Sequence, residues 1–80
     1  MLGALEFVEN PSDMNNIDEK FALIKPNTQT ANCSLPYGLW FQLKIGIRAI
    51  QIGFGADASV MKLRILNGTT WSGPTGVNLT

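Results

Sequence analysis

The sequence predicts a mainly β protein, a small antiparallel meander or sandwich with a short helical turn or lead-in near its N-terminus. Apolar and polar residues alternate in WFQLKI (40–45), AIQIGF (49–54) and VMKLRIL (60–66), which is the period-2 pattern of strands. A helical alternative is disfavoured, because Gly46 and Gly53 would each cost about 1 kcal/mol in a helix interior.

The N-terminal third begins with MLGALEFVE (1–9), whose mixed apolar spacing is compatible with a short helical turn or a lead-in strand. Residues 10–19 are dense in Asn, Asp, Ser and Pro, whose side chains bond to nearby backbone and interrupt regular ladders. Ser12 or Asp13 is placed to cap one helical turn there. FALIK (21–25) then predicts a strand that ends where proline follows.

A polar connection, PNTQTANCSLP (26–36), precedes the alternating segments. A connection of this length in a small domain is usually functional or packed on itself. In the alternating segments we expect the apolar set to face the core and the polar set to face outward. The expected inward residues are Phe41, Leu43, Ile45, Ile50, Ile52, Phe54, Met61, Leu63 and Ile65.

The C-terminal region predicts a hairpin. Asn67 and Gly68 form the pair favoured in two-residue type I′ turns, in which both central residues adopt positive φ. Residues 69–71 should form the returning strand, so that Trp71 covers the sheet.

Composition limits the classes of function. With 80 residues the chain forms one domain and buries only roughly 60–65% of its unfolded surface. Since 45% of its residues are hydrophobic and 15% charged, surplus apolar surface favours self-association. Six basic and six acidic residues create no field that would attract nucleic acid, and no apolar run approaches the roughly 20 residues that span a membrane. Cys33 is the only cysteine, which excludes an internal disulfide and suits an intracellular origin.

The residue inventory argues against catalysis. The chain has no histidine, which removes histidine-based triads and metal ligands. The carboxylates of Asp13, Asp18, Glu19 and Asp57 have no spacing that forces two of them together. We therefore predict a protein that is not an enzyme and that uses no cofactor or metal.

The outward face of the predicted sheet mixes amide, cationic and aromatic side chains, a combination that suits saccharides. Such a face is also compatible with simple solvation or with packing against another subunit. The candidate glycan-binding residues are Tyr37, Trp40, Gln42, Lys44, Gln51, Lys62 and Arg64.

The order of several short motifs resembles the small knob domains near the tips of phage tail fibres and R-type pyocin fibres. Those domains typically read D-L-N-x-I, a G-x-Y strand, an N-x-P loop, an aromatic strand, a Q-x-x-F strand, an Arg strand, an Asn/Gly turn and W-S-x-W. The matching segments here are DMNNI, FALI, ANCSLP, WFQLKI, QIGFG and KLRILNGTTWSG.

The resemblance runs from Asp13 to Ser72, with residues 1–12 as the lead-in of a single domain spanning 1–80. The chain departs from the pattern in two places. The glycine before the first aromatic strand is replaced around Glu19–Lys20, and the second tryptophan of W-S-x-W is Pro74. The terminal aromatic pair is therefore incomplete.

The resemblance implies a β-rich homotrimer in a virion tail fibre, made in bacterial cytoplasm. Its implied partners are the rest of the fibre and a bacterial cell-surface polysaccharide. Gln51, Arg64 and Trp71 occupy the family's recurrent Gln, Arg and Trp positions, where they serve the fold, the trimer or the ligand.

Three functions follow as hypotheses. The leading one is a receptor-binding tip module of a bacteriophage or phage-tail-like bacteriocin, which attaches to bacterial surface glycan. The alternative is a structural trimerisation or chaperone-like folding domain without receptor contact. The third is a fragment of a depolymerase spike whose active site lies elsewhere.

Overall fold

The structure, a computed structural model, describes residues 4–55 and 60–76, which form one six-stranded mixed sheet. A short 3₁₀ turn, η1 (Met14–Asn16), lies between the first two strands. The predicted mainly β class is confirmed. In order across the sheet the strands are β1 (Glu6–Glu9), β2 (Phe21–Lys25), β3 (Leu39–Ile45), β4 (Arg48–Phe54), β5 (Met61–Asn67) and β6 (Thr70–Gly76).

The sheet is mixed because β1 pairs with β2 in parallel, whereas each later strand pairs antiparallel with the one before it. A parallel pair needs a connection that crosses the sheet, and residues 10–20 supply it. The N-terminal segment left open by the sequence is thus a strand at Glu6–Glu9. Asp13 caps η1, since its side chain accepts a hydrogen bond from the backbone N–H of Asn15.

The hairpin between β5 and β6 differs from the prediction by one residue. Asn67 pairs directly with Thr70, so the two central turn residues are Gly68 and Thr69. Gly68 has a φ of +71°, and Asn67 is not among the residues with positive φ. Gly68, the first central residue, thus has a positive φ and Thr69, the second, does not, which is the pattern of a type II′ turn. The segment GADAS (55–59), whose composition predicts a turn, lies outside the described residues except for Gly55.

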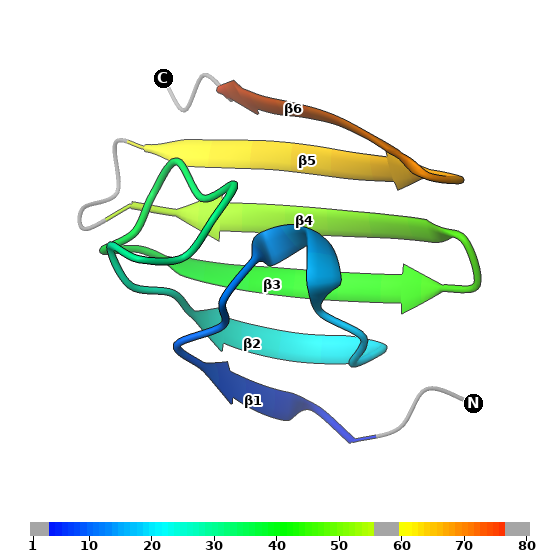
Figure 1. The fold of residues 1–80 in the computed structure, drawn as a ribbon, viewed down its shortest axis with the longest axis horizontal. Helices are drawn as coiled ribbons and strands as arrows, with labels where there is room; N and C mark the ends of the chain where they lie inside the picture. Colours follow the sequence, from blue (N-terminus) through cyan, green and yellow to red (C-terminus); the bar gives the residue numbers. More distant parts are fainter. Residues whose placement is uncertain (1–3, 56–59, 77–80) are drawn as a thin grey trace.

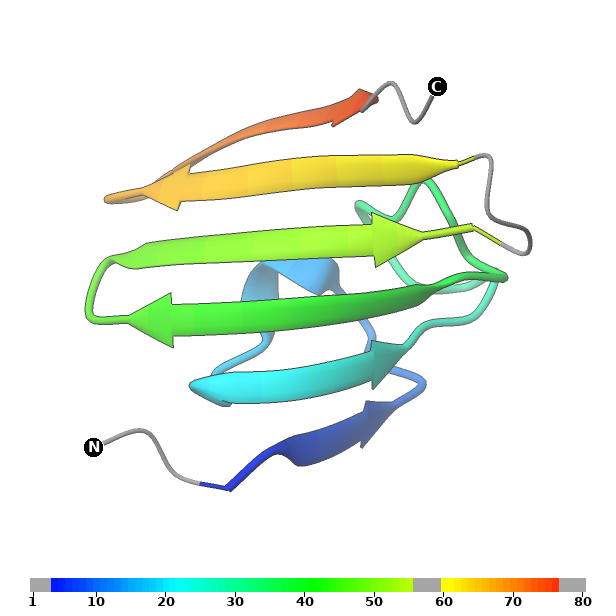
Figure 2. The same ribbon diagram turned by 180° about the vertical axis from the view of Figure 1, so that it is seen from behind.

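Two long connections cover one face of the sheet (Figure 1). They are residues 10–20, which include η1, and residues 26–38, which join β2 to β3. Seen from behind, the other face carries none of the described segments (Figure 2). The sheet therefore has one covered face and one open face, and these two names are used below.

The hydrophobic core lies between the covered face and the connections. Met14 and Ile17 from the first connection pack against Ala22, Ile24 and Trp40 of the sheet. The partly buried residues around this cluster are Val8, Cys33 and Leu35. A core this small is consistent with the length of the chain.

The sequence pattern assigned residues to faces correctly but placed the core on the wrong side. Phe41 pairs with Ile52, and Leu43 with Ile50, so the apolar residues of β3 and β4 share one face as expected. That face is the open one. The prediction that these residues point into the core of the chain is wrong, because the two connections pack on the opposite, more polar face.

Gly53 gives a direct test of packing on the covered face. A Cβ at this position would lie 2.5 Å from the Trp40 ring, so Gly53→Ala should lower the free energy of unfolding by about 1–3 kcal/mol. Gly76→Ala is the control, because nothing lies within 4 Å of a Cβ there. Urea unfolding of both variants measures the difference. Equal stability of the two variants would contradict the observed packing of Trp40.

Candidate functional site

The predicted glycan-binding residues do not share an exposed surface. The four buried residues are Trp40, Gln42, Gln51 and Arg64. Lys44 and Lys62 are half-buried, and Tyr37 is exposed. The prediction that this face projects outward is wrong for the buried four, because the connections pack over it.

Burial of polar side chains under the connections has a physical cause. The connections are mostly irregular, so their carbonyl groups lack ladder partners and need donors from elsewhere. Gln42 on β3 supplies two such bonds. Its Nε2 donates to the backbone carbonyl of Ile17 at 2.7 Å and to that of Glu19 at 2.9 Å. The polar side of the strand is therefore the side that these connections require.

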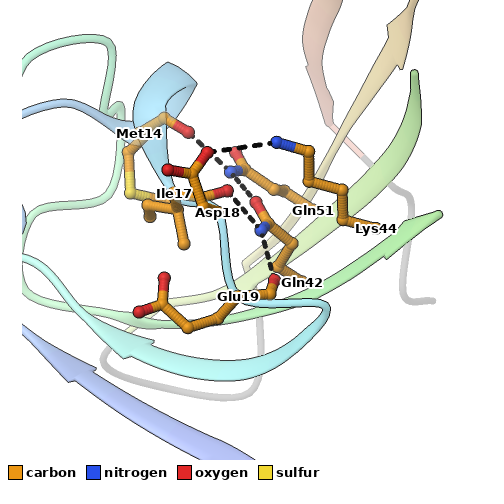
Figure 3. A network of polar contacts seen from close by, with 7 residues as sticks. All are labelled: Met14, Ile17, Asp18, Glu19, Gln42, Lys44 and Gln51. Atoms are coloured by element: carbon orange, nitrogen blue, oxygen red, sulfur yellow. Dashed lines mark hydrogen bonds and ion pairs between the residues drawn. The ribbon is translucent and has the colours of Figure 1, made fainter. Parts of the chain in front are cut away.

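Gln51 continues the network on β4, directly opposite Gln42 (Figure 3). Its Nε2 donates to the carbonyl of Met14 at 2.7 Å and to Oε1 of Gln42 at 2.8 Å. At the rim, Lys44 Nζ lies 3.4 Å from Asp18 Oδ1. Exposed ion pairs contribute at most about 1 kcal/mol, so the buried amides dominate.

Arg64 completes the network from β5, where it pairs with Gln51. One guanidinium nitrogen donates to Oε1 of Gln51 at 2.7 Å and the other donates to Oδ1 of Asn15. The guanidinium carbon lies 4.3 Å from the centroid of the Trp71 ring, a cation–π contact. Burial lowers the pKa of Arg64, and the Asp13 charge acts in the opposite direction.

Asp13 ties the two connections together. Its Oδ1 accepts from the Asn15 backbone N–H and from the side-chain amide of Asn32, each at 2.9 Å. Backbone bonds from Ala31 N to Ser12 O and from Met14 N to Ala31 O join the same segments. The hydrogen bond from Asn32, followed by that from Asn15, lowers the pKa of Asp13.

The open face is a continuous apolar surface. The exposed fraction of its exposed large side chains ranges from 37% for Leu43 and Ile65 to 72% for Phe7. Half-buried apolar residues fill the spaces between them. By strand alternation and pairing, the large apolar residues on this face are Phe7, Phe21, Leu23, Leu39, Phe41, Leu43, Ile45, Ile50, Ile52, Phe54, Met61, Leu63 and Ile65.

Charged residues on the open face are confined to strand ends. Glu9 and Lys25 pair at the ends of β1 and β2, and Arg48 begins β4. The other basic strand residues, Lys44, Lys62 and Arg64, lie on the covered face. The centre of the open face is therefore uncharged, which is the usual composition of a surface buried by a partner.

Tyr37 lines a cleft at one end of the sheet. The cleft has a volume of about 430 Å³ and lies where β2 ends and β3 begins. Its walls are two short segments, residues 25–28 and residues 36–39. Tyr37 is 81% exposed, and it is the predicted ligand-binding residue that the structure leaves accessible.

Several residues of these sites were missed at the sequence level. Asn15 and Asn32 join the network, while Asn27 and Thr28 line the cleft. The density of Asn in the two connections was a visible signal, because Asn side chains often bond to backbone in turns. This density of Asn did not indicate which face of the sheet the two connections would cover.

The described ranges contain neither a metal-binding cluster nor a helix that could span a membrane. Residues 4–55 and 60–76 contain no group of three or more His, Cys, Asp or Glu side chains arranged to hold a metal ion. Within the same ranges, no helix has the length and apolar character needed to cross a membrane. Asp57, one of the carboxylates considered for catalysis, lies outside the described residues.

Comparison with known proteins found no matching family model, no matching curated protein and no matching solved structure.

The network predicts a large cost for removing its central amide. Gln51→Met keeps similar volume but leaves the carbonyl of Met14 and a guanidinium N–H of Arg64 without partners. We expect the free energy of unfolding to fall by about 2–4 kcal/mol. Gln29→Met, at an exposed position, is the control and should change it by less than about 0.5 kcal/mol. Similar unfolding midpoints in urea would show that the network does not stabilise the fold.

The lowered pKa of Asp13 predicts that the stability of the fold depends on pH. Because its pKa is lowered below 3.8 by folding, its contribution is fully present above pH 3.8 and is lost as the pH falls through the lowered pKa. Asp13→Asn should therefore be less stable than the parent at about pH 6, and the difference should shrink towards about pH 2. Thermal unfolding of the parent and the variant across this pH range measures the difference in stability. A stability difference that stays constant with pH would contradict the role of the carboxylate.

Proposed function

We propose that this chain is a self-assembling module at the tip of a bacteriophage or phage-tail-like bacteriocin fibre, in which copies of the chain cover one another's open faces. The observation that carries the proposal is the open face, on which large apolar side chains extend from β1 to β5 around an uncharged centre. No described segment covers this face (Figure 2). Exposure of so many large apolar side chains to water is unfavourable. The hydrophobic effect therefore favours association that buries them.

The size of the open face suits an interface between copies. Six strands about 4.8 Å apart, with lengths up to seven residues at about 3.3 Å each, give a flat area of ~550 Å². This area is at the upper end of the about 300–600 Å² of the largest apolar patches on monomers, which are often binding sites, and is about two thirds of the roughly 800 Å² that each partner contributes to a standard interface. Three copies around a common axis can turn these apolar surfaces toward one another, so that each copy covers part of the other two.

The number of copies follows from the resemblance to fibre knob domains, which implies three chains around the fibre axis. Four residues of the resembling motifs stabilise the fold of this chain. Asp13, Gln51, Arg64 and Trp71 all belong to the network that holds the connections on the sheet. Their role is structural, which leaves the open face for assembly.

A second function, attachment to bacterial surface polysaccharide, is favoured by a separate observation. Tyr37 is an exposed aromatic on a short turn beside a polar cleft. Loop aromatics positioned by a rigid sheet are common in recognition sites. Assembly through the open face leaves most of the loop side of each copy available for such contact.

Ile50→Lys tests assembly. Ile50 lies at the centre of the open face, so a lysine there would place a charge in the interface while leaving the core on the covered face intact. We expect the parent to remain a trimer on tenfold dilution and the variant to associate at least about 100-fold more weakly. Light scattering coupled to size exclusion measures the mass, and circular dichroism checks the fold.

Gln29→Lys is the matched control, because Gln29 is exposed in the connection that lies on the opposite side of the sheet from the open face. It should leave the mass unchanged. A monomeric parent protein would contradict assembly through the open face, and a stable dimer would contradict the threefold arrangement.

A further inference from the structure

The cleft beside Tyr37 has two walls that the sheet brings together. Ile24 pairs with Trp40, so the chain leaving β2 and the chain entering β3 lie side by side. Lys25, Pro26, Asn27 and Thr28 form one wall, and Pro36, Tyr37, Gly38 and Leu39 form the other. The volume of about 430 Å³ is within the range of sites that bind small ligands.

The wall that carries Tyr37 is fixed in position. The backbone N–H of Gly38 donates to the carbonyl of Leu35 at 3.1 Å, which closes a tight turn. Gly38 also lies against β4, because a Cβ there would be 2.1 Å from the carbonyl oxygen of Phe54. Tyr37 is therefore an exposed ring on a backbone that has little freedom to move.

The opposite wall is held by its own hydrogen bonds. Asn27 Oδ1 accepts from the N–H of Gln29 at 2.7 Å, and Asn27 Nδ2 donates to Asn10 Oδ1 at 3.2 Å. The N–H of Asn27 donates to Thr30 Oγ1 at 3.1 Å. Thr30 in turn donates through its hydroxyl to the carbonyl of Pro11 at 2.7 Å. Both walls are thus preorganised, which reduces the entropy lost on binding.

The chemistry of the lining suits a sugar ring. Tyr37 carries an aromatic ring suited to stacking on the C–H face of a pyranose, and the opposite wall includes Thr28 and Lys25, which carry groups able to hydrogen-bond to sugar hydroxyls. The described lining residues of the cleft combine polar with apolar groups. We infer that this cleft binds one pyranose unit of a saccharide, stacked on Tyr37. The inference rests on the attachment function proposed above, and it assigns that function to a specific site.

Saturation-transfer NMR on the full chain tests the inference, with the methyl pyranosides of glucose, galactose and N-acetylglucosamine as probes. At least one probe should receive transfer from the parent protein. Tyr37→Ala should weaken that binding about tenfold, whereas Tyr37→Phe, which keeps the ring, should retain it. Ser34→Ala is the control, because Ser34 is exposed in the same connection but does not line the cleft. This variant should bind the sugar like the parent.

Binding of none of the three probes, or equal binding by Tyr37→Ala and the parent, would overturn the inference. The mass of each variant in solution separates this result from the assembly proposal. If the parent protein assembles but binds no sugar, the inference about the cleft is rejected and the assembly proposal stands. If the parent protein is a monomer whose sugar binding depends on Tyr37, the assembly proposal is rejected and the inference about the cleft stands.

Discussion

The structure depends on one constraint, which is that the carbonyl groups of the two connections must find donors when they are buried against the sheet. The chain of Gln42, Gln51 and Arg64 meets this constraint by crossing three adjacent strands in register. Their donors reach the carbonyls of Met14, Ile17 and Glu19 and the side chain of Asn15. Without these bonds each buried carbonyl would carry its full desolvation cost.

This constraint explains why the polar side of the sheet became the inside of the chain. An apolar sheet face offers no donors, so irregular backbone cannot cover it closely without losing hydrogen bonds. Met14, Ile17 and Trp40 add a small apolar cluster beside the network. The larger apolar set is left on the open face, where regular strands of another copy could cover it without exposed backbone polar groups.

The two sites proposed for this protein are separate consequences of the same arrangement. The open face is the surface that the connections do not cover, and the cleft beside Tyr37 is formed where the second connection leaves and rejoins the sheet. The two surfaces share Lys25 and Leu39 at one edge, so recognition and assembly are separated by substitutions at Tyr37 and Ile50, each of which belongs to one surface alone. Gln51, Arg64 and Trp71, which the fibre resemblance singles out, belong to neither surface, since they hold the connections in place.

The sequence by itself determined the strands from Phe21 onward and which of their residues share a face, because strand periodicity is a local property of the backbone. It predicted Phe21–Lys25 as a strand and the returning strand that carries Trp71. It placed the β5–β6 turn one residue early, because Asn67–Gly68 is favoured locally but the register pairs Asn67 with Thr70. Only the tertiary structure decided which face is covered, since hydrophobicity alone assigns the apolar face to the core. That choice depended on hydrogen bonds between residues far apart in the chain, such as Arg64 and Asn15.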